Sequence, residues 1–100
     1  MRYNLIITPA AQQDIEDALS YYLNIRLSLG EHFIDTIEVL CEKLKEKPHH
    51  YSFFGNQKRI RAVSLTTFPY LIVFQIEADS VYIFGLHNTH QNPETILKRF

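Results

Sequence analysis

Two groups of side chains in this sequence are of types that could carry chemistry. The stretch LHNTHQNP at residues 86–93 places two histidines, two asparagines and a glutamine between an apolar run and a proline. Arg59 and Arg61 lie in a second stretch, residues 47–76, that contains no acid. Histidines can ligate a metal or exchange protons near neutral pH, and arginines can bind a phosphate. LHNTHQNP is therefore a candidate metal site, a candidate catalytic site or only the polar exit of a buried strand.

A metal site is not what the spacing of these histidines favours. His87 and His90 are three residues apart, which brings two side chains together on a helix, but the pattern places them where a strand ends and a loop begins. No cysteine or carboxylate lies within three residues of either histidine to complete a set of ligands. We therefore expect no bound metal and no other cofactor.

A catalytic site is a second interpretation. Cleavage of RNA through its 2′-hydroxyl needs a base, an acid and cations that stabilise the charge developing on the phosphate. Arg59 and Arg61 would point the same way from a strand and could bind that phosphate. A histidine such as His90 is of the type that can exchange a proton near neutral pH. The other interpretation is that the arginines are solvated surface charges and that His90 faces solvent or a partner protein. Both interpretations stay open at this point.

The first half of the chain should contain a strand and two helices. Residues 2–8 alternate as a short strand, and the Thr-Pro pair that ends it is a typical helix start. Apolar side chains then recur at three- and four-residue steps over residues 11–25 and again over residues 33–44. Residues 28–31 have the S-x-x-E form of a capping box, which predicts the start of the second helix, and Pro48 ends it. So short a link predicts an antiparallel helical hairpin.

The second half changes to a strand pattern. Residues 58–65, 70–76 and 81–87 are expected to be strands joined by tight turns, which gives an antiparallel meander. The order of elements is then β-α-α-β-β-β, typical of an α+β fold with a helical hairpin packed on a small antiparallel sheet. A short helix could follow Pro93. One hundred residues suffice for one hydrophobic core, so residues 1–100 are expected to form a single domain.

The charge of the chain argues against a general nucleic-acid-binding protein. There are 10 Lys and Arg against 11 Asp and Glu, a net charge of −1. Residues 1–50 hold five basic and eight acidic side chains, whereas residues 51–100 hold five and three. Proteins that bind nucleic acids usually carry a marked positive excess. We therefore expect no direct sequence-specific binding to DNA, and the acid-free stretch is the one local candidate for a surface that faces an anion.

The sequence also indicates a compartment. No stretch approaches the roughly 20 apolar residues of a membrane span, and the start of the chain has neither a long apolar segment nor a small-residue cleavage site. Cys41 is the only cysteine, so no disulfide can form within the chain. These features predict a cytoplasmic protein that does not enter membranes.

Four segments together resemble a known family. They are AAQQDIEDALSYY in the first predicted helix, LG at the start of the second, FPYLIVFQIEADSVYIFGL over two predicted strands, and HQNPETILKR at the end. Over nearly the whole chain this combination resembles the RelE/ParE superfamily of bacterial type II toxins. The resemblance implies a small growth-inhibiting toxin that is held inactive by an antitoxin protein encoded beside it.

The superfamily has two branches with different chemistry. RelE-like members cut messenger RNA on the ribosome, and ParE-like members poison DNA gyrase. The tyrosine pair at the end of the first predicted helix resembles the ParE branch, and Leu71 stands where many members carry an arginine after the FPY motif. We therefore expect a ParE-like toxin without cleavage chemistry of its own. The alternatives are a RelE-like endoribonuclease that uses Arg59, Arg61 and His90, and an inactive toxin fold kept as an interaction module.

Overall fold

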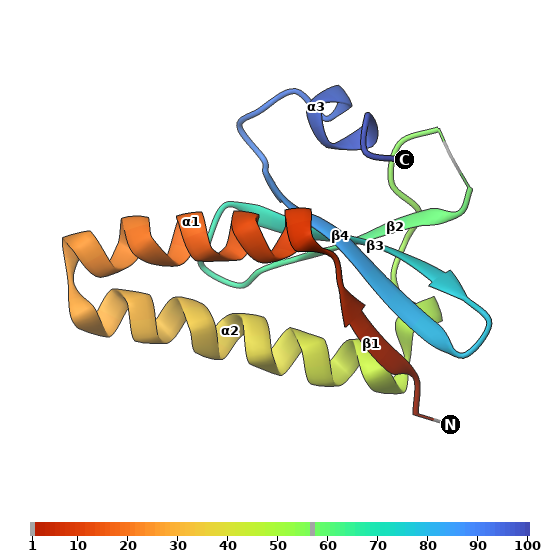
Figure 1. The fold of residues 1–100 in the computed structure, drawn as a ribbon, viewed down its shortest axis with the longest axis horizontal. Helices are drawn as coiled ribbons and strands as arrows, with labels where there is room; N and C mark the ends of the chain where they lie inside the picture. Colours follow the sequence, from red (N-terminus) through yellow and green to blue (C-terminus); the bar gives the residue numbers. More distant parts are fainter. Residues whose placement is uncertain (1, 57) are drawn as a thin grey trace.

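The order of elements along the chain is the expected one. The structure is a computed structural model, which describes residues 2–56 and 58–100. Figure 1 shows two long helices side by side, a sheet against one end of them, and a short third helix apart from both. The elements are β1 (Asn4–Ile7), α1 (Pro9–Ile25), α2 (Leu27–Glu46), the short 3-10 helix η1 (Pro48–His50), β2 (Ile60–Ser64), β3 (Tyr70–Glu77), β4 (Ser80–Asn88) and α3 (Glu94–Leu97).

The helical hairpin is confirmed, but one of its predicted caps is wrong. Helix α1 begins as expected, because the Thr8 hydroxyl oxygen accepts a hydrogen bond from the Ala11 amide at 3.2 Å. Helix α2 begins before the predicted capping box at residues 28–31, with Arg26 as its N-cap. The Ser28 hydroxyl accepts a hydrogen bond from the Arg26 side chain at 3.0 Å instead of capping a helix. One linking residue leaves no room for a separate cap, so α1 runs almost directly into α2.

The sheet is mixed rather than wholly antiparallel. Its strand order is β1-β4-β3-β2, and strands β2, β3 and β4 form the expected antiparallel meander. Strand β1 instead lies parallel to β4, with Leu5 opposite Val81. Both long helices and two strands separate β1 from β4 along the chain. Strand β1 is therefore an edge strand whose partner in the sheet is distant in sequence.

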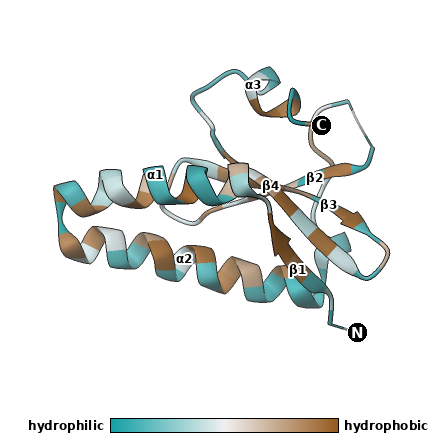
Figure 2. Cartoon of the chain, viewed as in Figure 1, coloured by the Kyte–Doolittle hydropathy of each residue, from teal (hydrophilic) through white to brown (hydrophobic). Residues whose placement is uncertain are grey.

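Most of the apolar side chains lie between the hairpin and one face of the sheet. Figure 2 shows hydrophobic residues along β1, β3 and β4 and alternating hydrophilic and hydrophobic residues on both long helices. The resulting major core buries Ala11, Ile15, Ala18, Tyr22, Phe33, Ile37, Leu40, Leu44, Val63, Leu65, Phe68, Ile72, Phe74, Val81, Ile83 and Leu86. None of the described helices is long and apolar enough to cross a membrane.

The opposite face of the sheet is covered by α3. Side chains alternate between the two faces of a strand, so Val73 faces away from the hairpin while its neighbours in sequence face the major core. Val73, Ile60 and Ile96 form a minor core there, which is flanked by Phe54, Ala62, Leu71, Leu97 and Phe100. Leu71, which stands where many members of the superfamily carry an arginine, packs against this minor core.

Candidate functional site

Arg61 has a structural role in addition to its position at the surface. Its guanidinium donates hydrogen bonds to the backbone carbonyls of Tyr51, at 2.6 Å, and His49, at 3.3 Å. The same group lies 4.1 Å from the centroid of the Phe53 ring, a cation-π contact. Arg61 therefore holds the segment after η1 against the edge of β2, and much of its hydrogen-bonding capacity is already used.

Arg59 lies outside the strand that was expected to carry it. The predicted strand at residues 58–65 begins only at Ile60, and Arg59 is an exposed residue of the preceding turn. Arg59 and Arg61 nevertheless share one shallow hollow of about 200 Å³. Its lining residues are His49, Phe53, Lys58, Arg59, Arg61 and Ile76. The structure thus brings the two arginines together at the β2 edge of the sheet.

His90 lies at a different place from the arginines. It is exposed in the turn after β4, and its backbone amide donates a hydrogen bond to the side-chain oxygen of Asn88 at 2.9 Å. Arg61 is paired with Phe74 of β3, whereas Asn88 is paired with Tyr70. Those two positions on β3 are four residues apart, which corresponds to about 14 Å along a strand. The three residues expected to act together in RNA cleavage therefore do not converge.

His87 is the buried end of a strand. Only 4% of its surface is exposed, and its ring packs against Phe54 with the centroids 5.9 Å apart. Burial lowers the pKa of His87 below its ordinary value, which favours the neutral ring. Within residues 2–56 and 58–100, no three side chains of His, Cys, Asp or Glu are grouped as metal ligands would be. The beginning of LHNTHQNP is thus a strand exit.

Three of the four segments that carry the family resemblance line one cleft. This cleft, called the tyrosine cleft below, has a volume of about 450 Å³ and lies between α1, the FPY turn and the exit of β4. Its lining residues are Asp14, Asp17, Ala18, Tyr21, Tyr22, Pro69, Tyr70, Leu86, Asn88 and Gln91. Asn88 and Gln91 of LHNTHQNP therefore contribute amide side chains to a surface built by distant segments.

The tyrosine cleft is acidic and aromatic. Asp14 and Asp17 contribute carboxylates, and none of the described residues that line the cleft is Lys or Arg. Burial, together with a hydrogen bond to Tyr22, raises the pKa of Tyr70 to about 12, so its phenol stays protonated. Tyr21 is 61% exposed, and its ring packs edge-on against the ring of Tyr22. The described lining residues thus lack the cations that would bind a phosphate, and the surface suits contact with a protein, where tyrosine is a favoured residue.

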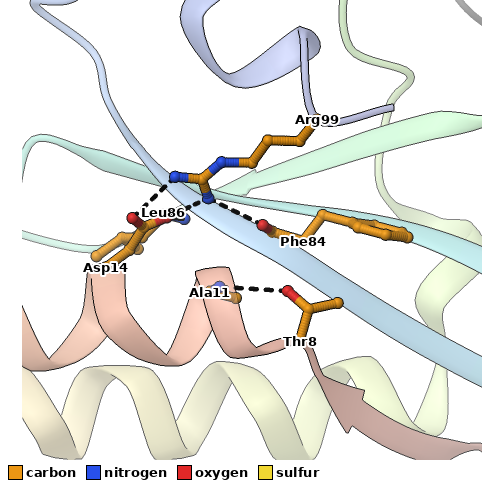
Figure 3. A network of polar contacts seen from close by, with 6 residues as sticks. All are labelled: Thr8, Ala11, Asp14, Phe84, Leu86 and Arg99. Carbon is orange, nitrogen blue, oxygen red and sulfur yellow. Dashed lines mark hydrogen bonds and ion pairs between the residues drawn. The ribbon is translucent and has the colours of Figure 1, made fainter.

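A polar latch adjoins the tyrosine cleft through Asp14. In Figure 3 the Arg99 guanidinium faces the Asp14 carboxylate, with its two nitrogens 2.6 and 3.0 Å from the two oxygens. Arg99 also donates to the Phe84 carbonyl at 3.0 Å, and Asp14 accepts from the Leu86 amide at 3.0 Å. The hydrogen bond from Arg99 to Asp14 also raises the pKa of Arg99. The Asp14-Arg99 latch therefore joins α1, β4 and the tail after α3.

A bulge in β4 makes the latch possible. Val73 is paired with Gly85 and Phe74 with Ile83, which leaves Phe84 as an extra residue. A Cβ at residue 85 would force the ends of the Ile96 and Arg99 side chains to shift, so glycine favours the close approach of the tail. The sequence analysis did not identify the latch. A glycine inside an apolar strand was the only available signal of a close approach.

Comparisons with known proteins identify a family and a similar fold. The family model described as "ParE toxin of type II toxin-antitoxin system, parDE" matches residues 5–93. The fold is also similar to a chain of the "Chromosomal ParDE TA system from P. aeruginosa", with a TM-score of 0.75 and 13% sequence identity, covering 87% of this chain and 96% of that one. At this identity the structural similarity shows the fold alone. No curated protein is similar enough in sequence to serve as a relative.

Proposed function

The chain belongs to the ParE toxin family of type II toxin-antitoxin systems, and we propose that it inhibits growth by binding a protein target, DNA gyrase, in the cytoplasm. In this proposal residues 1–100 act as one toxin domain, and an antitoxin encoded beside the toxin holds it inactive. The observation that carries the choice of mechanism is the separation of His90 from Arg59 and Arg61 along β3.

Electrostatics support a protein target over RNA. Cleavage of a phosphodiester needs cations at the place where the proton is transferred. In the cationic hollow beside β2, Arg61 is bonded to two backbone carbonyls. His90 lies instead in the turn after β4, between Asn88 and Gln91, which line the tyrosine cleft. Leu71 adds only apolar packing to the minor core. The arrangement therefore disfavours the endoribonuclease alternative, although its residues Arg59, Arg61 and His90 stay a prediction.

The tyrosine cleft is the surface that we assign to the target. It joins three separate motifs, it is open to solvent, and it presents an exposed tyrosine beside carboxylates and amides. Tyrosines are among the residues that contribute most to protein interfaces because they bury a large area at a small cost in conformational entropy.

The two mechanisms differ in what fails first after induction. We expect induced expression of the chain to alter plasmid supercoiling before any abundant transcript is depleted. Plasmid topology and primer-extension mapping of one message, measured over a time course in the same culture, test this order. Cleavage at ribosomal A-site codons within minutes, lost in His90→Ala, would overturn the proposal and favour the endoribonuclease. Growth without any inhibition would favour the inactive module.

A matched pair of variants tests the cleft itself. Tyr21 and Ile25 lie on α1 and are 61% and 56% exposed, but only Tyr21 lines the tyrosine cleft. Tyr21→Ala should weaken inhibition of purified gyrase by roughly tenfold or more, because truncation of a central interface tyrosine is costly. Ile25→Ala should inhibit gyrase as the unaltered protein does. Equal inhibition by both variants would remove the cleft from the proposed interface.

A further inference from the structure

Two carboxylates on α1 line the tyrosine cleft, and the structure describes a cationic partner for one of them. Asp14 and Asp17 are three positions apart, which places them on the same side of the helix. Asp14 is paired with Arg99 in the latch. Asp17 forms no ion pair with any described residue, and its carboxylate accepts a hydrogen bond from the uncharged Gln13 side chain at 2.8 Å. Within the described part of the chain, no cation balances the charge of Asp17.

An exposed tyrosine lies beside this carboxylate. Tyr21 follows Asp17 by four positions on α1, so the two side chains are neighbours on the surface of the helix. Tyr21 is 61% exposed and lines the same cleft. The face of an aromatic ring attracts a cation, as a carboxylate does. Gln91, after β4, adds an amide whose oxygen can accept a hydrogen bond. These groups together favour a cationic ligand that carries several N–H donors.

The latch next to the cleft indicates which cation fits this surface. The chain's own Arg99 binds Asp14 as a fork, with two nitrogens 2.6 and 3.0 Å from the two carboxylate oxygens. A guanidinium is planar, so it can form such a fork and also stack on an aromatic ring, whereas an ammonium is a compact point charge. The cleft has a volume of about 450 Å³, which leaves room for a further side chain beside the latch.

We propose that the tyrosine cleft binds an arginine side chain of the target protein, with the guanidinium between the carboxylate of Asp17 and the ring of Tyr21. This site rests on the proposed function, because it names the residue type that the target presents to the cleft. An exposed ion pair contributes little by itself, but a target that covers the cleft excludes water and strengthens both contacts. The cleft therefore selects a basic segment of the target and rejects an acidic one.

A titration with small molecules tests the site without the target. The probe is N-acetyl-arginine amide, added to the full-length toxin and followed by NMR through the ring signals of Tyr21. We expect saturable shifts with a dissociation constant in the millimolar range. The citrulline analogue has nearly the same shape but no charge, and it should produce no saturable shift. The lysine analogue should bind more weakly than the arginine probe, because an ammonium cannot form the fork.

Neighbouring carboxylates of α1 supply a matched pair of variants. Glu16 is exposed like Asp17 and accepts a hydrogen bond from Gln12 at 3.1 Å, but it does not line the cleft. Asp17→Asn and Glu16→Gln each remove one negative charge, so long-range attraction of a basic target changes equally in both. Asp17→Asn should weaken inhibition of purified gyrase by about tenfold or more, because the guanidinium of the target loses its partner. Glu16→Gln should inhibit as the unaltered toxin does.

The outcomes distinguish the arginine site from the proposed function. Equal shifts with the arginine and citrulline probes, or no saturable shift with arginine, would overturn the site. Binding of the lysine analogue as tight as that of arginine would overturn the choice of a guanidinium. Equal inhibition of gyrase by Asp17→Asn and Glu16→Gln would overturn the site and leave gyrase as the target. If the unaltered toxin does not inhibit gyrase, the proposed target is wrong, and the arginine titration alone decides whether the site exists.

Discussion

Among the residues that the structure describes, the major core on the hairpin face of the sheet contains 16 buried apolar residues, whereas the minor core between the opposite face and α3 contains three. The major core is stabilised by packing of the two long helices, which are consecutive in the chain, against the sheet. The second face depends on a short tail whose position is fixed by Arg99, Asp14 and the glycine at position 85. The stability of the domain should therefore come mainly from the first face, and the arrangement of the tail from a few polar contacts.

The largest expected effect is in the major core. Phe33 is fully buried and packs against Tyr22 and Phe68, with ring centroids about 5 Å apart. Phe33→Ala should reduce the free energy of unfolding by about 3–5 kcal/mol, because it removes a large side chain and leaves a cavity. Denaturant unfolding measures this change. Ile96→Ala, a smaller truncation in the minor core, is the comparison. An equal loss in both variants would contradict the difference between the two faces.

A smaller effect is expected at the latch. Asp14→Asn removes the charge that pairs with Arg99 and should lower the free energy of unfolding by about 1 kcal/mol, since both side chains are partly exposed and solvent screens the pair. The same change should speed amide exchange over residues 94–100. Asp17→Asn is the control, because Asp17 lines the same cleft but its only described side-chain partner is Gln13. A tail that exchanges equally slowly in both variants would mean that the minor core alone positions it.

The sequence predicted the first face well for a physical reason. Helix periodicity and the Thr8 cap are local signals, and the interactions that they indicate also form locally. The capping box predicted at residues 28–31 is wrong, because α2 already begins at Leu27 and the single residue between the helices, Arg26, is its N-cap. The parallel pairing of β1 with β4 could not be predicted from the sequence. Alternation of side chains indicates which residues share a face of a strand, but not which strand lies beside it.

The candidate site was predicted only in part. The end of the strand in LHNTHQNP was predicted to within one residue, because an apolar run that ends in polar residues is a local pattern. The tyrosine cleft and the latch join segments from opposite ends of the chain: Asp14 and Arg99 are 85 positions apart. Pairings of this kind depend on the bulge in β4 and on the register of the sheet, neither of which the residue pattern specifies.

The smallest expected effect concerns His87, which lies on the α3 face of the sheet near Phe54. Burial lowers the pKa of His87 from its ordinary value of 6.5, so below that pH the unfolded chain binds a proton more readily than the folded one. The free energy of unfolding should therefore rise with pH through this range and decline as the pH falls below about 6.5. Unfolding measured at several values between pH 7.5 and 5 gives this slope.

A pair of histidine variants tests whether the pH dependence of the free energy of unfolding comes from His87 on the α3 face of the sheet. His87→Asn should flatten the pH dependence, because it removes the buried group whose pKa is lowered in the fold. His90→Asn, at an exposed position just after the same strand, is the control variant. A slope that persists in His87→Asn would mean that another group titrates on folding. A slope that disappears would show that the sparsely packed face of the sheet is also the one that senses pH, since protonation of His87 would place a charge beside Phe54 and the minor core.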